Sequence, residues 1–311
     1  MAKQKTNLKK ENPPPLIRKC GAVAVHYRLL EEDPNFRLNQ LSLEGLVAKR
    51  MASGLVARKG KPRVISVVVH VVFKQPGENI SDAQIKSQIT VLNKDYSATN
   101  TDKKDTPSVW KGLVTSANIQ FALAKTDPKG KKTTGITRTK TTKDSFPSDD
   151  SVKSAAKGGH AAWPSAKYLN IWVCNLGDRL LGYAQFPGGP PATDGVVILS
   201  TAFGTQGTAA KPFDKGRTAT HEIGHWLNLH HIWGDTQHCE GSDLVDDTPN
   251  AQQPNFGKPK FPHISCKNGP SGDMFMNYMD YVDDDTMVMF TAGQVTRITA
   301  TLDGPRNTLG G

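Results

Sequence analysis

The stretch that decides the fold is Thr220–Asp235, THEIGHWLNLHHIWGD. His221 and His225 are four residues apart, so on a helix both project from one face, where two imidazoles can reach a single zinc ion. Glu222 lies beside them and is placed for a water molecule rather than for the metal. The alternative interpretation is a helix that carries two surface histidines. The pattern favours a zinc site on a helix.

A third ligand has to come from further along the chain. His231 follows His225 by six residues, and on a continuing helix it would point roughly 240° away. Asn228 stands between them and readily takes the left-handed conformation that ends a helix, so the chain can turn and bring His231 back. His230 is the competing ligand, but the six-residue spacing favours His231.

Three neutral imidazoles leave one coordination position open, which is typical of a catalytic zinc site. Water at that position becomes acidic, and Glu222 can accept its proton and pass it to a leaving amine. The reaction that this set of groups fits best is peptide-bond hydrolysis.

Composition excludes several classes of protein. The chain has 311 residues, 37% of them hydrophobic, which is enough for one large domain or for one domain with an appendage. No apolar run approaches about 18 residues, so we expect no membrane partner. Of the net charge of +10, residues 1–61 carry +8 and the rest of the chain +2, and within that rest residues 221–290 carry −8. Because the basic front and the acidic back attract each other, we expect no nucleic-acid partner.

Strands and helices are predicted from periodicity. Ser81 and Gln84 form a capping box ahead of a helix over residues 82–96, and Thr291 with Gln294 opens a last helix. Apolar, β-branched runs predict strands over residues 64–73, 118–124, 168–175 and 195–200. Residues 16–57 have irregular helical spacing, which predicts short helices that lie on something else. Strands that first alternate with helices and then give way to a long irregular region favour an α+β fold.

The front of the chain is set apart by a linker. Residues 57–63, ARKGKPR, are charged and contain Gly and Pro, which is typical of a protease-sensitive connection. We therefore divide the chain into residues 1–60 and 61–311. The first fifteen residues are basic and polar, with no apolar core of a secretory signal peptide behind them.

At this point the chain resembles the metzincin clan of metalloproteases, and within it the pappalysin family, chiefly its small ulilysin-like members. His221, Glu222, His225 and His231 match the extended zinc motif, with Asn228 where the family usually has Gly. The segment from Asn277 to Tyr281, NYMDY, looks like the family's Met-turn. The resemblance covers most of the chain from Arg18 onward. It implies a twisted mixed sheet above the cleft, the zinc helix at its floor, an irregular lower part, and an edge strand near residues 181–186.

The family also implies roles for single residues. Met279 would lie beneath the zinc site as a hydrophobic base, and Tyr281 would stabilise the oxyanion of the tetrahedral intermediate. Without the family, these residues would be an ordinary core methionine and an ordinary loop aromatic. Asp284 would line the pocket for the residue after the scissile bond and select Arg or Lys. The alternative is that residues 283–285 form a solvated acidic turn.

A calcium loop is implied over residues 242–249, SDLVDDTP, where Asp243 and Thr248 match the family's oxygen ligands. The alternative is a solvated acidic loop. Cys239 and Cys266 match a family disulfide that would tie this loop down.

The front segment resembles a cysteine switch at Arg18-Lys19-Cys20-Gly21. The Cys20 thiolate would take zinc's fourth position, and residues 1–60 would act as an inhibitory pro-segment on the same chain. The alternative is a free thiol on a floppy tail. Activation would need a cut near residues 57–61, with Ala57-Arg58 as the autolytic bond.

The sequence thus predicts a secreted, latent zinc endopeptidase that activates itself and cleaves polypeptides on the amino side of Arg or Lys. A non-catalytic zinc-binding or adhesion module is the second hypothesis, and the presence of Glu222 and Tyr281 argues against it. A third, an intracellular zinc protein, follows from the missing signal peptide. The bridge between Cys239 and Cys266 argues for an oxidising compartment instead.

Overall fold

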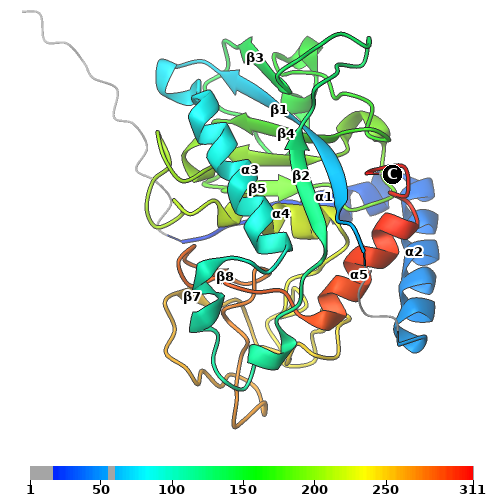
Figure 1. The fold of residues 1–311 in the computed structure, drawn as a ribbon, viewed down its shortest axis with the longest axis vertical. Helices are drawn as coiled ribbons and strands as arrows, with labels where there is room; N and C mark the ends of the chain where they lie inside the picture. The colour runs from blue at the N-terminus through cyan, green and yellow to red at the C-terminus, as the bar shows by residue number, and fades with distance from the viewer. Residues whose placement is uncertain (1–16, 55–59, 311) are drawn as a thin grey trace, which may run out of the picture.

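The computed structural model describes residues 17–54 and 60–310, and in these ranges it is an α+β structure, as the sequence predicts (Figure 1). The helices are α1 (Ala22–Glu32), α2 (Pro34–Ala52), α3 (Asp82–Tyr96), α4 (Arg217–Trp226) and α5 (Ala292–Asp303). The strands are β1 (Arg63–Phe73), β2 (Ile119–Leu123), β3 (Ile136–Lys140), β4 (Leu169–Cys174), β5 (Gly182–Ala184), β6 (Val196–Leu199), β7 (Phe256–Gly257) and β8 (Tyr281–Val282).

Six strands form a mixed sheet in the order β2-β1-β4-β6-β5, and β3 pairs with the second half of β1. All neighbours are parallel except β5, which runs antiparallel to β6 at the edge of the sheet. This edge strand lies inside the predicted range 181–186. The sequence did not predict β3, because its residues ITRTK are polar and leave no apolar run to recognise.

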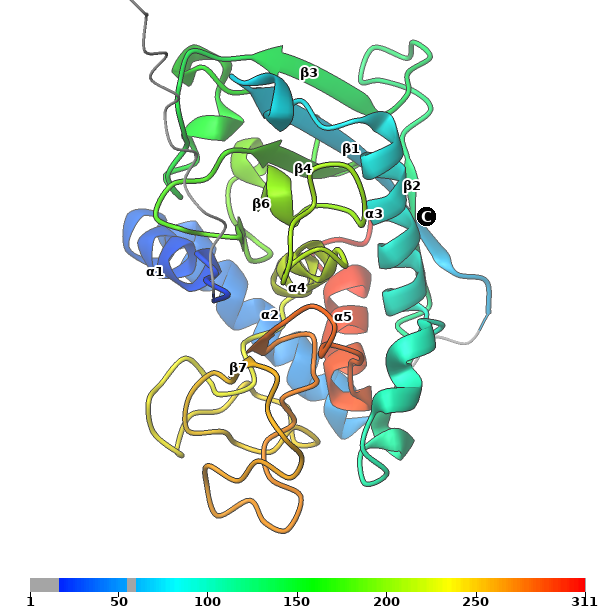
Figure 2. The ribbon, with the colours of Figure 1, turned by 90° about the vertical axis from the view of Figure 1, so that its left-hand side faces the viewer.

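The apolar runs behave as buried strands. Every residue of β4 is buried, and so are most residues of β1, because helices and loops cover both faces. Helix α3 begins where the capping box predicts, with the Gln84 amide donating to Ser81 Oγ at 3.1 Å. Its buried face carries Ile85, Leu92 and Tyr96. Figure 2 shows α3 and α4 lying beside the sheet.

Below the sheet the chain is largely irregular. The two-residue strands β7 and β8 pair there, and α5 follows with the predicted capping box between Thr291 and Gln294. Helix α4 thus lies between the sheet and this lower part, as Figures 1 and 2 show.

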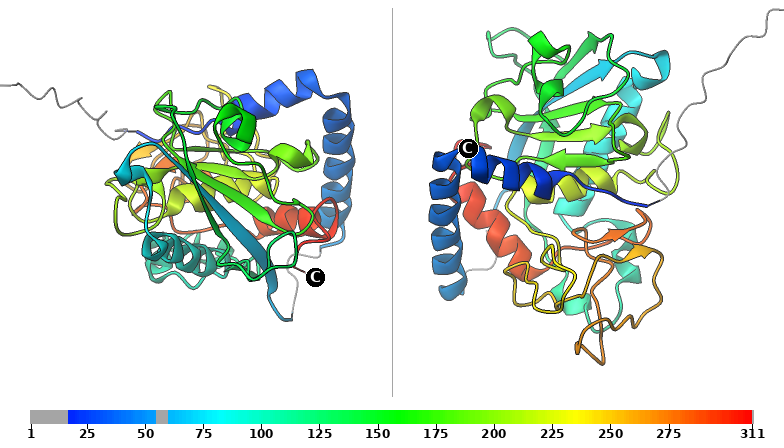
Figure 3. Two further views of the ribbon diagram at one scale, coloured as in Figure 1. Left: turned by 90° about the horizontal axis from the view of Figure 1, so that it is seen from above. Right: turned by 180° about the vertical axis from the view of Figure 1, so that it is seen from behind.

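The front segment wraps around the rest of the molecule. Helix α1 runs along the level of α4, and α2 turns to lie beside α5 (Figure 3). The expectation of short helices is correct for α1 but wrong for α2, which has 19 residues. Its start is set by Pro34 at the first position and by the Asp33 side chain, which accepts from the Asn35 amide at 2.9 Å.

The expected cut between Ala57 and Arg58 lies outside the described residues. Within the described ranges, no helix has the length and apolar character that crossing a bilayer requires.

Candidate metal centre and cleft

Helix α4 ends at Trp226, and the turn after it sets the geometry of the centre. Asn228 has φ 72°, in the left-handed region that the sequence predicted for it. The Leu229 amide donates to the Gly224 carbonyl at 2.9 Å and closes the helix end. The chain then reverses, so the structure brings His231, and not His230, to the face of His221 and His225.

The three imidazoles converge on one point. The Nε2 atoms of His221, His225 and His231 lie 3.0 to 3.2 Å apart. Zinc–nitrogen bonds of about 2.0–2.1 Å place tetrahedral ligands about 3.3 Å apart, so the separations suit a single ion. All three side chains are buried.

The partners of the other ring nitrogen, Nδ1, show whether each Nε2 carries a proton or a lone pair. Nδ1 of His221 lies 2.7 Å from the Tyr278 carbonyl, that of His225 lies 2.8 Å from the Leu229 carbonyl, and that of His231 lies 2.5 Å from Asp235 Oδ1. A carbonyl or carboxylate only accepts, so each Nδ1 carries the proton and each Nε2 keeps its lone pair. Three lone pairs at this spacing repel one another unless a cation lies between them, and the donor set therefore fits a metal.

Burial keeps the imidazoles in the form that binds metal. It lowers the pKa of both His221 and His225 well below the usual range, and the neighbouring histidines act in the same direction. Neutral rings are the ligand form of histidine.

Met279, which the resemblance implies as the base of the centre, is fully buried. Gly224 of α4 packs directly on its sulfur, and a side chain at Gly224 would collide with it. The preceding residue, Tyr278, supplies the carbonyl that orients His221.

Glu222 is buried beside the cluster, 1% exposed, and burial raises its pKa to about 8. The Cys20 thiol donates to its Oε2 at 3.3 Å. Gly182 of the edge strand approaches closely, and a Cβ there would stand 2.8 Å from the Glu222 side chain. The edge strand therefore needs glycine at this point to lie against the carboxylate.

Cys20 belongs to the metal-binding group as well as to the edge of the sheet. Its sulfur and the three histidine nitrogens all lie within 4.8 Å of one another. It forms a parallel bridge to Gly182, with Leu181 donating to the Lys19 carbonyl and Gly21 to the Gly182 carbonyl, both at 2.9 Å. Its own amide donates to the Tyr281 hydroxyl at 3.3 Å. The front segment thus adds a short strand to β5 over the histidine cluster.

Arg18, two residues earlier, fills a buried acidic pocket. Its Nη2 lies 2.6 Å from Asp284 Oδ1, Nη1 donates to Thr218 Oγ1 at 3.0 Å, and Nε donates to the Val282 carbonyl at 3.2 Å. The Phe213 ring lies 4.9 Å from the guanidinium carbon. Asp284 is fully buried, which excludes the alternative of a solvated turn at this residue.

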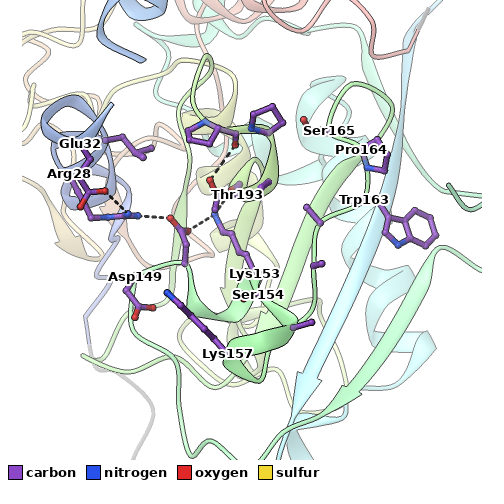
Figure 4. A pocket seen from close by; sticks show the side chains of 18 residues that line it. Arg28, Glu32, Asp149, Lys153, Ser154, Lys157, Trp163, Pro164, Ser165 and Thr193 are labelled. Atoms are coloured by element: carbon purple, nitrogen blue, oxygen red, sulfur yellow. Dashed lines mark hydrogen bonds and ion pairs between the residues drawn. The ribbon is translucent and has the colours of Figure 1, made fainter. Parts of the chain in front are cut away.

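A second basic residue of the front segment also forms an ion pair with the rest of the chain. Arg28 Nη2 of α1 lies 2.5 Å from Asp150 Oδ2, and Lys153 Nζ lies 2.8 Å from Asp150 Oδ1. Figure 4 shows Arg28 and Lys153 pointing toward each other from opposite elements. They line a cavity of about 720 Å³ between α1 and the loops around residues 149–165 and 190–193.

Cys239 and Cys266 form a disulfide, the pairing that the resemblance implied. In the neighbouring loop, Thr248 Oγ1 donates to the Asp243 carboxylate, 2.9 and 2.8 Å from its two oxygens. Both residues are buried, and burial raises the pKa of Asp243 to about 7.

Sequence reasoning missed three groups at this site. The signal for Arg18 was its basic side chain two positions before Cys20. The signal for Asp235 was its position in the stretch Thr220–Asp235. The carbonyls of Leu229 and Tyr278 carry no signal in residue identity, because any residue supplies a carbonyl.

Comparisons with known proteins agree with this centre. The family model described as Pregnancy-associated plasma protein-A matches residues 153–303. An "Extracellular metalloprotease" of Arthroderma benhamiae is 31% identical over 287 residues, covering 90% of this chain and 89% of that protein. "Extracellular metalloprotease 1" of Coccidioides posadasii is 32% identical over 268 residues, covering 82% of each chain.

Solved structures share a higher sequence identity with this chain. A promirolysin mutant of Tannerella forsythia is 46% identical with a TM-score of 0.86, covering 94% of this chain and 96% of that one. Mature mirolysin of Tannerella forsythia in complex with a cleaved peptide is 52% identical with a TM-score of 0.79, covering 80% and 96%. A metalloprotease of this kind implies zinc, which the histidine cluster fits. The chain belongs to the pappalysin family of metzincins and is a zinc metalloendopeptidase.

Proposed function

We propose that this chain is the latent form of a secreted endopeptidase that cleaves on the amino side of Arg or Lys and removes its own pro-segment. One observation supports both the proposed latency and the proposed preference for Arg or Lys. Cys20 lies at the three histidines while Arg18 of the same short strand is paired with Asp284 in a buried pocket. The front segment thus places a thiol and a basic side chain where a substrate would present its reacting bond and its basic residue.

His221, His225 and His231 would hold the zinc ion, with Cys20 as the fourth ligand in the latent chain. When bound, zinc acidifies a water molecule and polarises the scissile carbonyl. Glu222 would accept the proton from water and deliver it to the leaving amine.

The Tyr281 hydroxyl would donate to the developing oxyanion. In the latent chain this hydroxyl accepts from the Cys20 backbone amide. The front segment therefore contacts the same hydroxyl that would stabilise the oxyanion. Met279 would support the centre from below through its contact with Gly224.

The direction of the front segment supports its role as an inhibitor. Arg18 precedes Cys20 in the chain, whereas a substrate's basic residue follows its scissile bond. A substrate with that residue on Asp284 must therefore run opposite to the front segment, antiparallel to β5. A segment bound backwards does not present its own peptide bond for cleavage, so it can fill the cleft without being cut.

Tethering strengthens this inhibition, because a thiol on the same chain has a high effective concentration at the metal. We propose residues 1–60 as the pro-segment and residues 61–311 as the catalytic domain. The bond Ala57-Arg58 has the arginine that the Asp284 pocket would select, and we propose it as the autolytic site.

We also propose a structural calcium ion at Asp243 and Thr248. The buried Asp243 carboxylate accepts from the Thr248 hydroxyl and the Val245 amide, and a cation would offset the cost of burying its charge, which raises its pKa. Removal of calcium with EGTA should lower the melting temperature of the protein. A melting temperature that is the same with EGTA and with calcium would contradict the site.

Export to an oxidising compartment is supported by the disulfide between Cys239 and Cys266 and by the names of the relatives. Recovery of the native protein from the culture medium, with that bridge intact, tests this part of the proposal. Recovery only from the cell interior with reduced thiols would contradict it.

The catalytic proposal is tested by mapping cuts in an arginine-containing polypeptide. The wild-type chain should cut before Arg, and Glu222→Gln should lower the rate by at least about a hundredfold. Glu240→Gln, an exposed glutamate in the lower part, is the matched control and should cut like wild type. Equal cleavage by Glu222→Gln would overturn the mechanism, and cuts without preference for Arg or Lys would overturn the specificity.

A further inference from the structure

Another ion pair joins the front segment to the rest of the chain, away from Cys20, Arg18 and Arg28. Glu44 of α2 meets Arg297 of α5 with both oxygens, Nη2 to Oε1 at 2.7 Å and Nη1 to Oε2 at 3.0 Å. Asn228 Nδ2 donates to Oε1 at 2.9 Å. The Arg297 side chain is 1% exposed. One carboxylate thus receives three donors from two buried residues.

All three donors belong to the part that would remain after the pro-segment leaves. Within the described ranges, Glu44 is the carboxylate that forms an ion pair with Arg297. The third guanidinium nitrogen, Nε, donates to the Asn228 carbonyl at 3.1 Å and fixes the plane of the fork. Removal of α2 would leave two Arg297 nitrogens and the Asn228 amide aimed at one empty position. A bidentate fork with fixed orientation is a specific receptor for a carboxylate.

The surroundings indicate that the carboxylate arrives on a helix with apolar residues beside it. Leu43 and Val47, on either side of Glu44, pack with Ala300 of α5 in a small apolar cluster. This cluster and the ion pair lie along the contact between α2 and α5, visible in Figure 3. A free small carboxylate would miss these apolar contacts, whereas a helix that carries a glutamate between two apolar residues would make both kinds.

We propose that Arg297 and Asn228 form a carboxylate-binding site on the catalytic part of the chain, filled by Glu44 in the latent form. Once the pro-segment is detached, the site binds the released helical segment 22–52 in trans through the same glutamate. The inference rests on the proposed function only in that the pro-segment is removed. It uses neither the thiol of Cys20 nor the pocket at Asp284.

The site touches the metal centre through Asn228. Asn228 closes α4 and turns the chain toward His231. In the latent form its backbone carbonyl accepts from Arg297, and its side-chain amide donates to Glu44. A carboxylate in the site therefore holds the turn that positions His231, which makes Arg297 a positioning residue rather than a catalytic one.

The first test uses the full chain. Glu44→Gln is compared with Glu32→Gln, whose side chain on α1 is 60% exposed. Both are made with Glu222→Gln so that no self-cleavage interferes. Hydrogen exchange of the α2 amides should be at least tenfold faster in Glu44→Gln than in the parent and unchanged in Glu32→Gln. Equal exchange in Glu44→Gln and the parent would overturn the proposal.

The second test measures binding to the processed chain, also with Glu222→Gln so that the probe stays intact. The probes are fluorescent peptides of residues 22–52, one with Glu44 and one with Glu44→Gln. Their apolar contacts are identical, so the carboxylate alone should account for an affinity difference of at least tenfold. Equal affinities, or no binding of either peptide, would overturn the site. Discrimination by the Glu222→Gln chain, combined with no peptide hydrolysis by the processed chain that keeps Glu222, would support the site while the proposed function fails.

Discussion

At the scale of single residues, the proposed preference for Arg or Lys would depend on Asp284. Its Oδ2 accepts from the Lys215 and Arg217 amides at 2.8 and 3.1 Å, which holds Oδ1 toward the Arg18 guanidinium. The carboxylate is thus fixed in orientation before any basic side chain enters, and a fixed carboxylate discriminates better than a mobile one.

Asp284→Asn removes the charge but keeps one oxygen for the two amides. Because a buried charge pair is worth about 2–5 kcal/mol, we expect kcat/KM for a peptide with Arg after the scissile bond to fall at least 30-fold. A matched peptide with Gln at that position should be cleaved at a similar rate by both enzymes. An equal loss on the two peptides would show that Asp284 supports the fold rather than the selection of Arg.

At this scale, some residues of the site could be predicted from the sequence and others could not. The three histidines, Glu222 and the turn at Asn228 follow from side-chain types and spacing, since the chemistry lies within a few residues. Asp235 and the Tyr278 carbonyl could not be assigned in the same way. Their roles depend on where the loop folds back, and on backbone groups that every residue has.

At the scale of elements, β1 contains a buried histidine outside the metal centre. His70 lies between Thr137 Oγ1 at 2.8 Å and Asn170 Oδ1 at 3.0 Å, and it stacks on His160 at 4.3 Å. Burial, together with the nearby His160, lowers the pKa of His70 to about 3. The strand therefore contains a neutral imidazole that resists protonation.

A depressed histidine pKa makes stability depend on pH. The unfolded chain binds a proton near pH 6.5 and the folded chain only near pH 3, so stability is full above 6.5 and is lost as pH falls. We expect His70 to account for about 2 kcal/mol of unfolding free energy lost between pH 7 and 4.5. Urea unfolding of His70→Gln across this range should show a loss smaller by that amount, and equal losses would contradict the assignment.

Elements with strong local signals were predictable, and those that depend on distant partners were not. Capping boxes predict helices α3 and α5, and apolar runs predict strands β1 and β4. Strand β3 exists because β1 is long enough to pair with β2 along its first half and with β3 along its second. Helix α2 is long because α5 offers a surface for Leu43 and Val47, which the irregular spacing of that segment did not reveal.

At the scale of the whole molecule, latency depends on a front segment held at several points. Cys20 and Arg18 fill the cleft, Arg28 meets Asp150 at one side, and Glu44 meets Arg297 behind the metal centre. Loss of one contact should shorten the life of the precursor without releasing the segment outright.

Cys20→Ala removes the expected fourth ligand and should shorten the lifetime of the intact precursor at least tenfold at neutral pH. Cys174→Ala, a change at the other free cysteine, buried in β4, is the control and should leave that lifetime unchanged. The readout is the fraction of full-length chain over time by mass spectrometry. Equal lifetimes for Cys20→Ala and wild type would remove the thiol from the latency mechanism.

The chain's organisation was only partly accessible from sequence. The basic front and the acidic residues 221–290 indicated that the front lies on the back, and the ion pair between Arg18 and Asp284 is one such contact. The path of the segment along β5 was not foreseen, because a three-residue edge strand gives no pattern of its own.

Zinc-edge X-ray absorption of the intact full-length chain tests the central claim most directly. It should show one zinc per chain, bound to three nitrogens at about 2.0–2.1 Å and one sulfur at about 2.3 Å. The sulfur contribution should vanish in Cys20→Ser. A zinc without sulfur in the wild-type chain would contradict the thiol plug, and a chain that binds no zinc through its histidines would contradict the whole account.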